Sequence, residues 1–251
     1  MEADTTTMTE QASATSYQVD YREARVGDEI HFVPAYALRR PAAVRVLRGE
    51  HFEPLTHALV AKLMEMRPGP MVHAGTFFGD MLPSFSRACP ARLYAFEPVL
   101  ENYVLAKKCI EANRLTNVLL TNAGLSDSIE VAFMDTGDGD KHRGGASRLA
   151  EWGQPAMVTT IDSFAIEGLS VLQLDVEGHE LAALKGAVKT IEASKPVILV
   201  EDNKRACDEF LQGLGYRRSG RLPGIFVWAT PADKKTILPL VREMRQQGEA
   251  A

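Results

Sequence analysis

The sequence predicts a doubly wound α/β fold with a mostly parallel sheet, and three observations support this prediction. Short apolar segments alternate with longer segments whose apolar residues recur at helical spacing. Such alternation is typical of parallel strands joined by helices. The last two apolar segments are separated only by a short turn, which predicts an antiparallel strand at one edge. The chain has 251 residues, 45% hydrophobic and 24% charged, so its composition is that of an ordinary globular protein.

The predicted elements follow one another regularly from the first long helix onward. An apolar stripe over Phe52–Met66 predicts that helix, which the Pro-Gly-Pro run at 68–70 ends. The expected strands are Met71–Ala74, Leu93–Phe96, Val118–Thr121, Val131–Met134 near an edge, Val171–Leu174, Val197–Val200, Tyr216–Ser219 and Ile225–Trp228. The expected helices between them are Leu82–Ala88, Leu100–Ala112, Gly178–Ala193 and Arg205–Leu214.

The remaining segments are those on either side of the main domain and one long loop within it. Residues 1–17 contain almost no large apolar side chains, so we expect them to be disordered, and 18–51 to form an N-terminal cap of short strands and turns. The main domain is predicted over 52–230. Residues 231–251 are expected to form an amphipathic helix on this domain or on a partner, which Pro239 would interrupt or kink. The glycine-rich segment Asp135–Arg148 is predicted to be a loop, either closing over a substrate or lying on the surface.

Composition also excludes several functional classes. Asp and Glu (33) outnumber Lys and Arg (28), and the formal charge of -5 argues against a nucleic-acid partner. Met1–Ser16 lacks the features of a signal peptide, and no apolar run is long enough to span a membrane. The three cysteines have no metal-binding spacing and are expected to be reduced, buried thiols. A cytoplasmic location with no membrane partner is therefore the prediction.

Glycines and a carboxylate follow the first two strands of the predicted sheet. Ligands of this architecture bind at the carboxyl ends of the strands. Gly75 and Gly79 would let the backbone approach a ligand, and Glu97 could accept both hydrogen bonds of a ribose diol, which together predict an adenosine-like ligand. Glu97 argues against a 2'-phosphorylated dinucleotide, and the lack of a full G-x-G-x-x-G argues against NAD. A purely steric role of the glycines stays open.

Five segments of the chain, in order and spacing, resemble the FkbM-type family of S-adenosylmethionine-dependent methyltransferases. The resemblance covers about Phe52–Trp228, and its most specific part is the D-x-E-G-x-E motif that begins at Asp175. It implies a seven-stranded, Rossmann-like methyltransferase sheet with an antiparallel edge strand. Two positions depart from the family pattern: His73 stands where many members carry an acidic residue, and Gln173 where a lysine often stands. The five segments are 72–79, 95–98, 122–127, 174–180 and 197–201.

The resemblance also implies a placement for S-adenosylmethionine. The cofactor is expected over the glycines that follow the first strand, with its ribose on Glu97. Its adenine is expected near the residues that follow the third strand. The implied cofactor-binding residues are Gly75, Thr76, Gly79, Glu97, Asn122, Ala123 and Gly124.

Transfer to an aliphatic hydroxyl needs a general base or a metal ion that acidifies the hydroxyl. Asp175 and His179 are the candidate bases, although His179 could equally be a surface or capping residue. Asp175, Glu201 and Asp202 end two strands that should be neighbours, and together they suggest a Mg²⁺ site. Asp202 could instead begin the next helix.

These observations predict an S-adenosylmethionine-dependent O-methyltransferase. Its acceptor is expected to be a hydroxylated small molecule, either a sugar or another secondary metabolite. A homodimer is compatible with the sequence. Two alternatives stay open: a nucleotide-binding oxidoreductase, which the same glycines and Glu97 would serve, and a nonenzymatic binding protein that keeps this fold.

Overall fold

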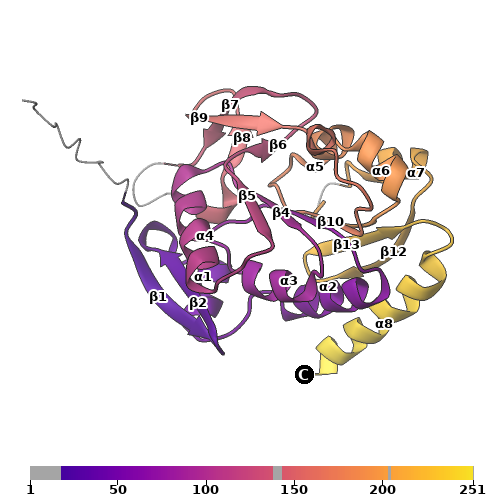
Figure 1. Cartoon of the computed structure of the whole chain (residues 1–251), viewed down its shortest axis with the longest axis horizontal. Coiled ribbons are helices and arrows are strands. Elements are labelled where there is room, and N and C mark those ends of the chain that lie inside the picture. Colours follow the sequence, from indigo (N-terminus) through magenta and orange to yellow (C-terminus); the bar gives the residue numbers. More distant parts are fainter. Residues whose placement is uncertain (1–17, 138–142, 203–204, 251) are drawn as a thin grey trace, which may run out of the picture.

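The computed structural model describes residues 18–137, 143–202 and 205–250, so the expected disorder of 1–17 lies outside the described residues. A seven-stranded sheet of order β12-β13-β11-β10-β3-β4-β5 forms its centre (Figure 1). The five strands from β11 to β5 are parallel, as predicted. The antiparallel strand is β13, which lies one place in from the edge, between β11 and the edge strand β12. The strands are β3 (Met71–Ala74), β4 (Leu93–Phe96), β5 (Val118–Thr121), β10 (Val171–Leu174), β11 (Val197–Val200), β12 (Arg217–Leu222) and β13 (Ile225–Ala229).

Helices cover both faces of this sheet, as a doubly wound fold requires. Alternate side chains of each central strand point to opposite faces, so Val171 of β10 packs in one apolar cluster and Leu172 in the other. The face of the first cluster carries α2 (Pro54–Met66), α3 (Leu82–Ala88) and α8 (Lys234–Ala250), and α4 (Leu100–Ala112) lies beside them. The other face carries α5 (Glu180–Lys185), α6 (Val188–Ser194) and α7 (Asp208–Gly213).

The single helix expected over Gly178–Ala193 is wrong, because the chain forms α5 and α6 with a break between them. A Cβ at Gly186 would lie 1.9 Å from the carbonyl oxygen of Ser126. The break therefore lets the backbone at Gly186 pass close to Ser126. The Asp162 carboxylate accepts hydrogen bonds from the amides of Lys189 and Thr190, at 3.1 and 2.9 Å. These bonds satisfy free amides at the start of α6, so a second helix begins there.

The C-terminal helix α8 continues through Pro239 rather than being interrupted there. Ile237, Val241 and Met244 are buried against the sheet and α2. A Cβ at Gly220 of β12 would lie 2.5 Å from Val241, so the helix and the edge strand are in close contact. This packing on its own domain offsets the cost of the missing proline hydrogen bond.

A second, four-stranded sheet of order β6-β9-β7-β8 lies above the main one (Figure 1). The strand expected at Val131–Met134 near an edge belongs to this sheet. Its neighbour β9 was not predicted. In the small sheet, β7 lies between β8 and β9 and pairs antiparallel with both. Its strands are β6 (Gly124–Leu125), β7 (Glu130–Asp135), β8 (Arg148–Ala150) and β9 (Gln154–Thr159).

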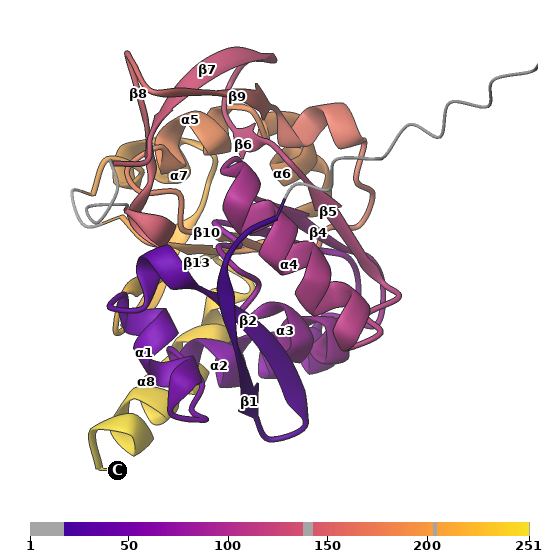
Figure 2. The same ribbon diagram turned by 90° about the vertical axis from the view of Figure 1, so that its left-hand side faces the viewer.

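The N-terminal cap is a hairpin of β1 (Tyr21–Val26) and β2 (Glu29–Pro34), followed by the helix α1 (Pro41–Leu47). Strand β2 packs against α4, and Figure 2 shows the hairpin crossing that helix. Helix α1 was not predicted. Short 3-10 helices are Ala35–Ala37, Gly144–Ala146 and Ile161–Phe164. The three cysteines are free and buried, as expected. Within the described ranges, every helix is too short or too polar to cross a membrane.

Candidate active site

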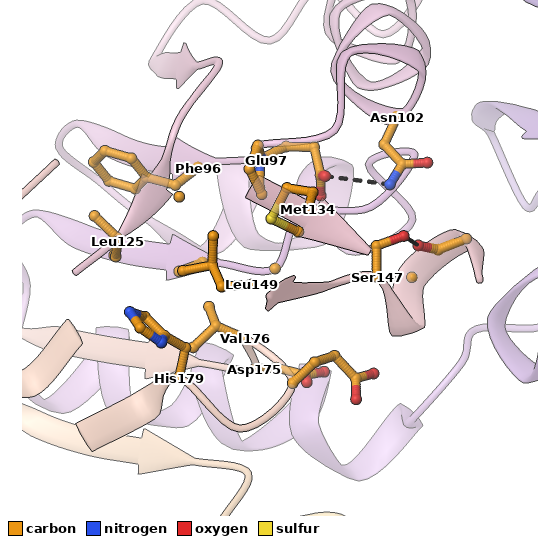
Figure 3. Close-up of a pocket in the computed structure, with 17 residues that line it drawn as sticks. Phe96, Glu97, Asn102, Leu125, Met134, Ser147, Leu149, Asp175, Val176 and His179 are labelled. Atoms are coloured by element: carbon orange, nitrogen blue, oxygen red, sulfur yellow. Dashed lines mark hydrogen bonds between the residues drawn. The ribbon is translucent and has the colours of Figure 1, made fainter. Parts of the chain in front are cut away.

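A cavity of about 490 Å³, counted with its open mouth, lies at the carboxyl ends of β3, β4 and β10. Figure 3 shows Glu97 and Asn102 on one side of it and Asp175, Val176 and His179 on the opposite side. The cavity is lined by Ala74, Gly75, Phe96, Glu97, Pro98, Asn102, Gly124, Leu125, Met134, Gly144, Gly145, Ser147, Leu149, Asp175, Val176, Glu177 and His179.

Gly75 allows two strand ends to meet at the floor of this cavity. Its φ is +86°, and a Cβ there would lie 1.8 Å from the carbonyl oxygen of Asp175. The Asp175 amide donates to the Ala74 carbonyl oxygen at 3.1 Å, so β3 and β10 stay in register up to this point. Only glycine fits a backbone that is both left-handed and this close to its neighbour.

Glu97 is buried and accepts three hydrogen bonds from the protein. Its donors are the Phe77 amide (2.7 Å), the Val99 amide (2.9 Å) and Asn102 Nδ2 (3.2 Å). Burial raises the pKa of Glu97 to about 7, although these hydrogen bonds oppose the shift. Because a carboxylate offers about four acceptor positions, Glu97 keeps room for a ligand hydroxyl while bracing the loop after β3.

Three residues other than glycine adopt a left-handed backbone around the site: Glu53 (φ 51°), Phe77 (φ 50°) and Glu177 (φ 55°). Such conformations cost free energy and cluster at functional sites. The Phe77 ring lies under the turn at Gly144–Ala146, since a Cβ at Gly145 would come 3.1 Å from it. The described end of the loop Asp135–Arg148 therefore reaches the cavity wall.

Asp175 and Glu201 form a hydrogen-bonded carboxyl pair behind the cavity floor. They follow the neighbouring parallel strands β10 and β11, and the Glu201 amide donates to the Leu174 carbonyl oxygen at 2.9 Å. Loss of solvent around Asp175, and next the hydrogen bond to Glu201, raise the pKa of Asp175 well above its usual value. Of the two, only Asp175 lines the cavity. The pair therefore places a carboxyl group of raised pKa next to the ligand space.

The loop that carries Asp175 is held by Glu180, another carboxylate of the D-x-E-G-x-E motif. Glu180 is buried, and its Oε1 accepts from the amides of Val176 and Gly178, at 3.0 and 3.1 Å. Glu177 instead lines the cavity, and desolvation raises its pKa. The motif thus combines a structural carboxylate with two that face the ligand space.

His179 lines the cavity, as a candidate base must. Its Nε2 lies 3.0 Å from Ser126 Oγ, and partial burial lowers the pKa of its imidazole. A neutral ring is the form that can accept a proton. However, Nε2 of His179 already forms a hydrogen bond with the Ser126 hydroxyl. His179 is therefore less available than Asp175 to accept a proton from a ligand.

Of the other residues predicted to bind the cofactor, Gly124 lines the cavity, whereas Thr76, Gly79, Asn122 and Ala123 are not part of its lining. Thr76 and Ala123 are buried, and Gly79 packs against α4, where a Cβ would lie 3.2 Å from the Ala106 Cα. Gly79 therefore serves a steric purpose, one of the two roles left open for it. Asn122 Nδ2 donates to the carbonyl oxygens of Glu97 and Pro98, at 2.8 and 3.2 Å, and lines a neighbouring groove.

The predicted magnesium ligands do not converge. Asp202 is buried, and its Oδ2 accepts from the Cys207 amide at 2.6 Å, so it caps the next turn of the chain. That was the alternative interpretation of this residue. Glu201 faces Asp175. Among the residues described here, no group of three or more His, Cys, Asp or Glu side chains is arranged to hold a metal ion.

Sequence reasoning missed the lining that comes from the small sheet. Met134, Ser147 and Leu149 reach the cavity from β7, β8 and the turn between them. No local pattern marks them, because their position depends on the pairing of β7 with β8. Asn102 was also missed, although an amide in the first turn after Glu97 is a signal that could have indicated its contact.

Several solved structures are similar to this chain at low sequence identity. Similar solved structures include the methyltransferase FkbM from Methylobacillus flagellatus (18% identity, 65% of this chain, TM-score 0.47) and a methyltransferase from Geobacter sulfurreducens (14%, 77%, 0.45). An O-methyltransferase from Bacillus cereus in complex with SAH is 13% identical over 70% of this chain, with a TM-score of 0.44. The matches cover 44%, 87% and 80% of those chains, so this chain spans less than half of the Methylobacillus protein. No curated protein matches it in sequence.

The sequence model of the methyltransferase FkbM domain matches residues 73–246, more than half of the chain. The match includes Gly75, Glu97 and the D-x-E-G-x-E motif, which together form the floor and one wall of the cavity. This protein belongs to the methyltransferase FkbM domain family.

Proposed function

We propose that this protein is an S-adenosylmethionine-dependent O-methyltransferase acting on a hydroxyl of a small molecule, either a sugar or another secondary metabolite. The observation that carries the proposal is the cavity of an FkbM-domain chain in which Glu97 and Asp175 stand on opposite walls. A ribose diol and a hydroxyl that must lose a proton would each find a carboxyl group there.

The chemistry of the lining fits the cofactor. Phe96, Pro98 and Leu125 provide an apolar wall for an adenine ring, and Glu97 keeps an acceptor position for a ribose hydroxyl. Glu177 and the Asp175–Glu201 pair supply negative charge for a cationic ligand. When bound, S-adenosylmethionine supplies a methyl group on a sulfonium sulfur, which is transferred in line and needs alignment above all.

Asp175 is the group that receives the proton of the acceptor hydroxyl. One of its oxygens accepts that proton, while its own proton moves along the hydrogen bond to Glu201. The carboxyl pair then carries one additional proton, which balances the proton lost by the acceptor. His179 forms a hydrogen bond with Ser126 and is part of the cavity wall, which Asp175 also lines.

The test is formation of S-adenosylhomocysteine, followed by mass spectrometry, when the protein is mixed with S-adenosylmethionine and a panel of hydroxylated small molecules. We expect acceptor-dependent turnover that Asp175→Asn reduces at least about a hundredfold, the lower range for loss of a general base. Glu192→Gln, on the exposed side of α6, is the matched control.

Two outcomes would replace the proposal. Binding of NADH in place of S-adenosylmethionine, followed by its fluorescence, would favour a nucleotide-binding oxidoreductase. Tight binding of S-adenosylmethionine with no turnover across the panel would favour a nonenzymatic binding protein.

A further inference from the structure

The small sheet leaves a broad apolar face exposed on the side away from the cavity. Val131 of β7 pairs with Met157 of β9, and Phe133 pairs with Pro155, so these four side chains share one face. Val131 is 60% exposed, Phe133 43% and Met157 46%. Ile129 and Trp152, which flank the strands, are 61% and 67% exposed. We call these six residues the outer face.

Strand β7 is apolar on both sides, which is unusual for a strand at a protein surface. Met134 points to the other side from Phe133 and lines the cavity together with Leu149 of β8. A strand with one solvated face normally alternates apolar and polar residues, whereas a strand covered on both faces has a continuous apolar run. The run from Val131 to Met134 therefore indicates that another layer covers the outer face.

The residues outside the described ranges contain few large apolar side chains that could cover this face. Of the residues that the structure does not describe, 1–17 contain only Met1, Met8 and Tyr17 as large apolar side chains. Residues 138–142 and 203–204 contain no apolar side chain, and 251 is an alanine. An exposed apolar face of this size is typical of a site that contacts another molecule.

A groove beside the outer face offers space for a protruding side chain of another molecule. It holds about 890 Å³, counted with its open side, and runs between β9 and the start of α4. Trp152 comes two residues before β9 begins, so the most exposed large apolar residue stands next to this groove. The apolar part of the groove is formed by Pro98, Val99, Leu100, Met134, Pro155 and Met157.

We propose that the outer face and this groove form the interface of a two-fold symmetric dimer of this chain, in which the partner's Trp152 occupies the groove. A projecting tryptophan next to an apolar groove is self-complementary across a two-fold axis, as an isologous contact requires. Tryptophan seated in a pocket is also the typical anchor of an interface.

The apolar area available suits a dimer of standard size. Large apolar side chains contribute roughly 150–250 Å² each when fully covered, so those of the outer face, about half exposed, offer roughly 400–500 Å². The groove walls and the polar rim supply the rest of the ~800 Å² per subunit that stable interfaces bury. Because Pro98 and Met134 line both the groove and the cavity, such a dimer would also support the cavity wall.

Sedimentation velocity of the full chain over a range of concentrations tests the proposal without cofactor or turnover, so its result is independent of the proposed function. We expect a concentration-dependent dimer. Met157→Glu would place a charge in the apolar part of this interface and raise the dimer Kd about a hundredfold. Met66→Glu is the matched control, since Met66 is 47% exposed, like Met157, but lies at the end of α2. It should leave the dimer Kd unchanged.

Tryptophan fluorescence gives a second measurement, because Trp228 is buried and only Trp152 should change environment. Dilution through the dimer Kd should shift the emission to longer wavelength, and Trp152→Phe should abolish the shift. Trp152→Ala should weaken the dimer while the thermal unfolding midpoint of the monomer is kept. A wild-type protein that is monomeric at every concentration, or equal dimerisation of Met157→Glu and Met66→Glu, would overturn the proposal.

Discussion

His73 and Gln173 stand opposite each other on the neighbouring parallel strands β3 and β10, and His73 Nδ1 forms a hydrogen bond with Gln173 Oε1. Both side chains are buried. These are the two positions that the sequence predicted to depart from the family pattern. In the structure they form one neutral hydrogen-bonded pair between neighbouring strands.

This coupling predicts a non-additive double mutant. Gln173→Lys alone should destabilise the protein by about 3–5 kcal/mol, because it buries a charge without a counterion. His73→Asp alone should be similarly unfavourable. The double variant should recover much of this loss, with a coupling of up to about 3 kcal/mol between neighbouring sites. Urea denaturation of the four proteins measures the coupling, and strictly additive losses would show that the two positions are independent.

His73 also predicts a pH dependence. Burial lowers its pKa to about 4, although the bond to Gln173 opposes the shift. The unfolded chain therefore binds a proton between pH 6.5 and 4 that the folded protein does not, and the free energy of unfolding falls as the pH is lowered through this range. Relative to His73→Gln, the wild type should lose about 3 kcal/mol between pH 7 and pH 4. A constant difference between the two proteins would contradict this assignment.

Gly75→Ala is expected to disrupt the floor of the cavity. The substitution adds left-handed strain of about 1–2 kcal/mol and an overlap with the Asp175 carbonyl that costs about 1–3 kcal/mol more. Gly215→Ala isolates the strain, since Gly215 has the same φ of +86° but no atom within 4 Å of the added Cβ. Thermal unfolding should show a clearly larger loss for Gly75→Ala. Equal losses would mean that the contact with Asp175 is unimportant.

The carboxyl pair should be visible by infrared difference spectroscopy. Because its pKa is raised, Asp175 is expected to give a carboxylic acid band that persists above the pH at which an exposed aspartic acid ionises, and Asp175→Asn should remove this band. Glu201→Gln should shift the titration of this band to lower pH, because it removes a negative charge that raises the pKa of Asp175. Glu192→Gln serves as the control. If the band titrates identically with and without Glu201, the two residues do not share a proton.

The main sheet could be predicted from the sequence because each of its strands is a short apolar run followed by a polar turn. The predicted positions of β3, β4 and β10 agree with the structure, and these strands place Gly75, Glu97 and Asp175 at one edge. Gly79 and Asp202 were harder to assign, since a steric glycine and a capping aspartate have the same sequence context as ligand-binding ones.

The small sheet illustrates what local sequence does not specify. Strand β9 begins with Gln154 and Pro155, and its pairing with β7 is set by tertiary contacts rather than by propensity. The cavity residues Met134 and Leu149 depend on this pairing, so they could not be inferred. The helix break at Gly186 likewise depends on a distant contact, with Ser126.

Isothermal titration calorimetry with S-adenosylhomocysteine tests the central claim most directly. The wild type should bind one equivalent, and Glu97→Ala should weaken binding at least about tenfold, since a hydrogen bond to a charged group contributes about 1.5–3 kcal/mol. Glu111→Ala, an exposed change on the same helix that follows Glu97, should bind like the wild type. Absence of binding to the wild type, or an unchanged Kd in a folded Glu97→Ala variant, would contradict the account.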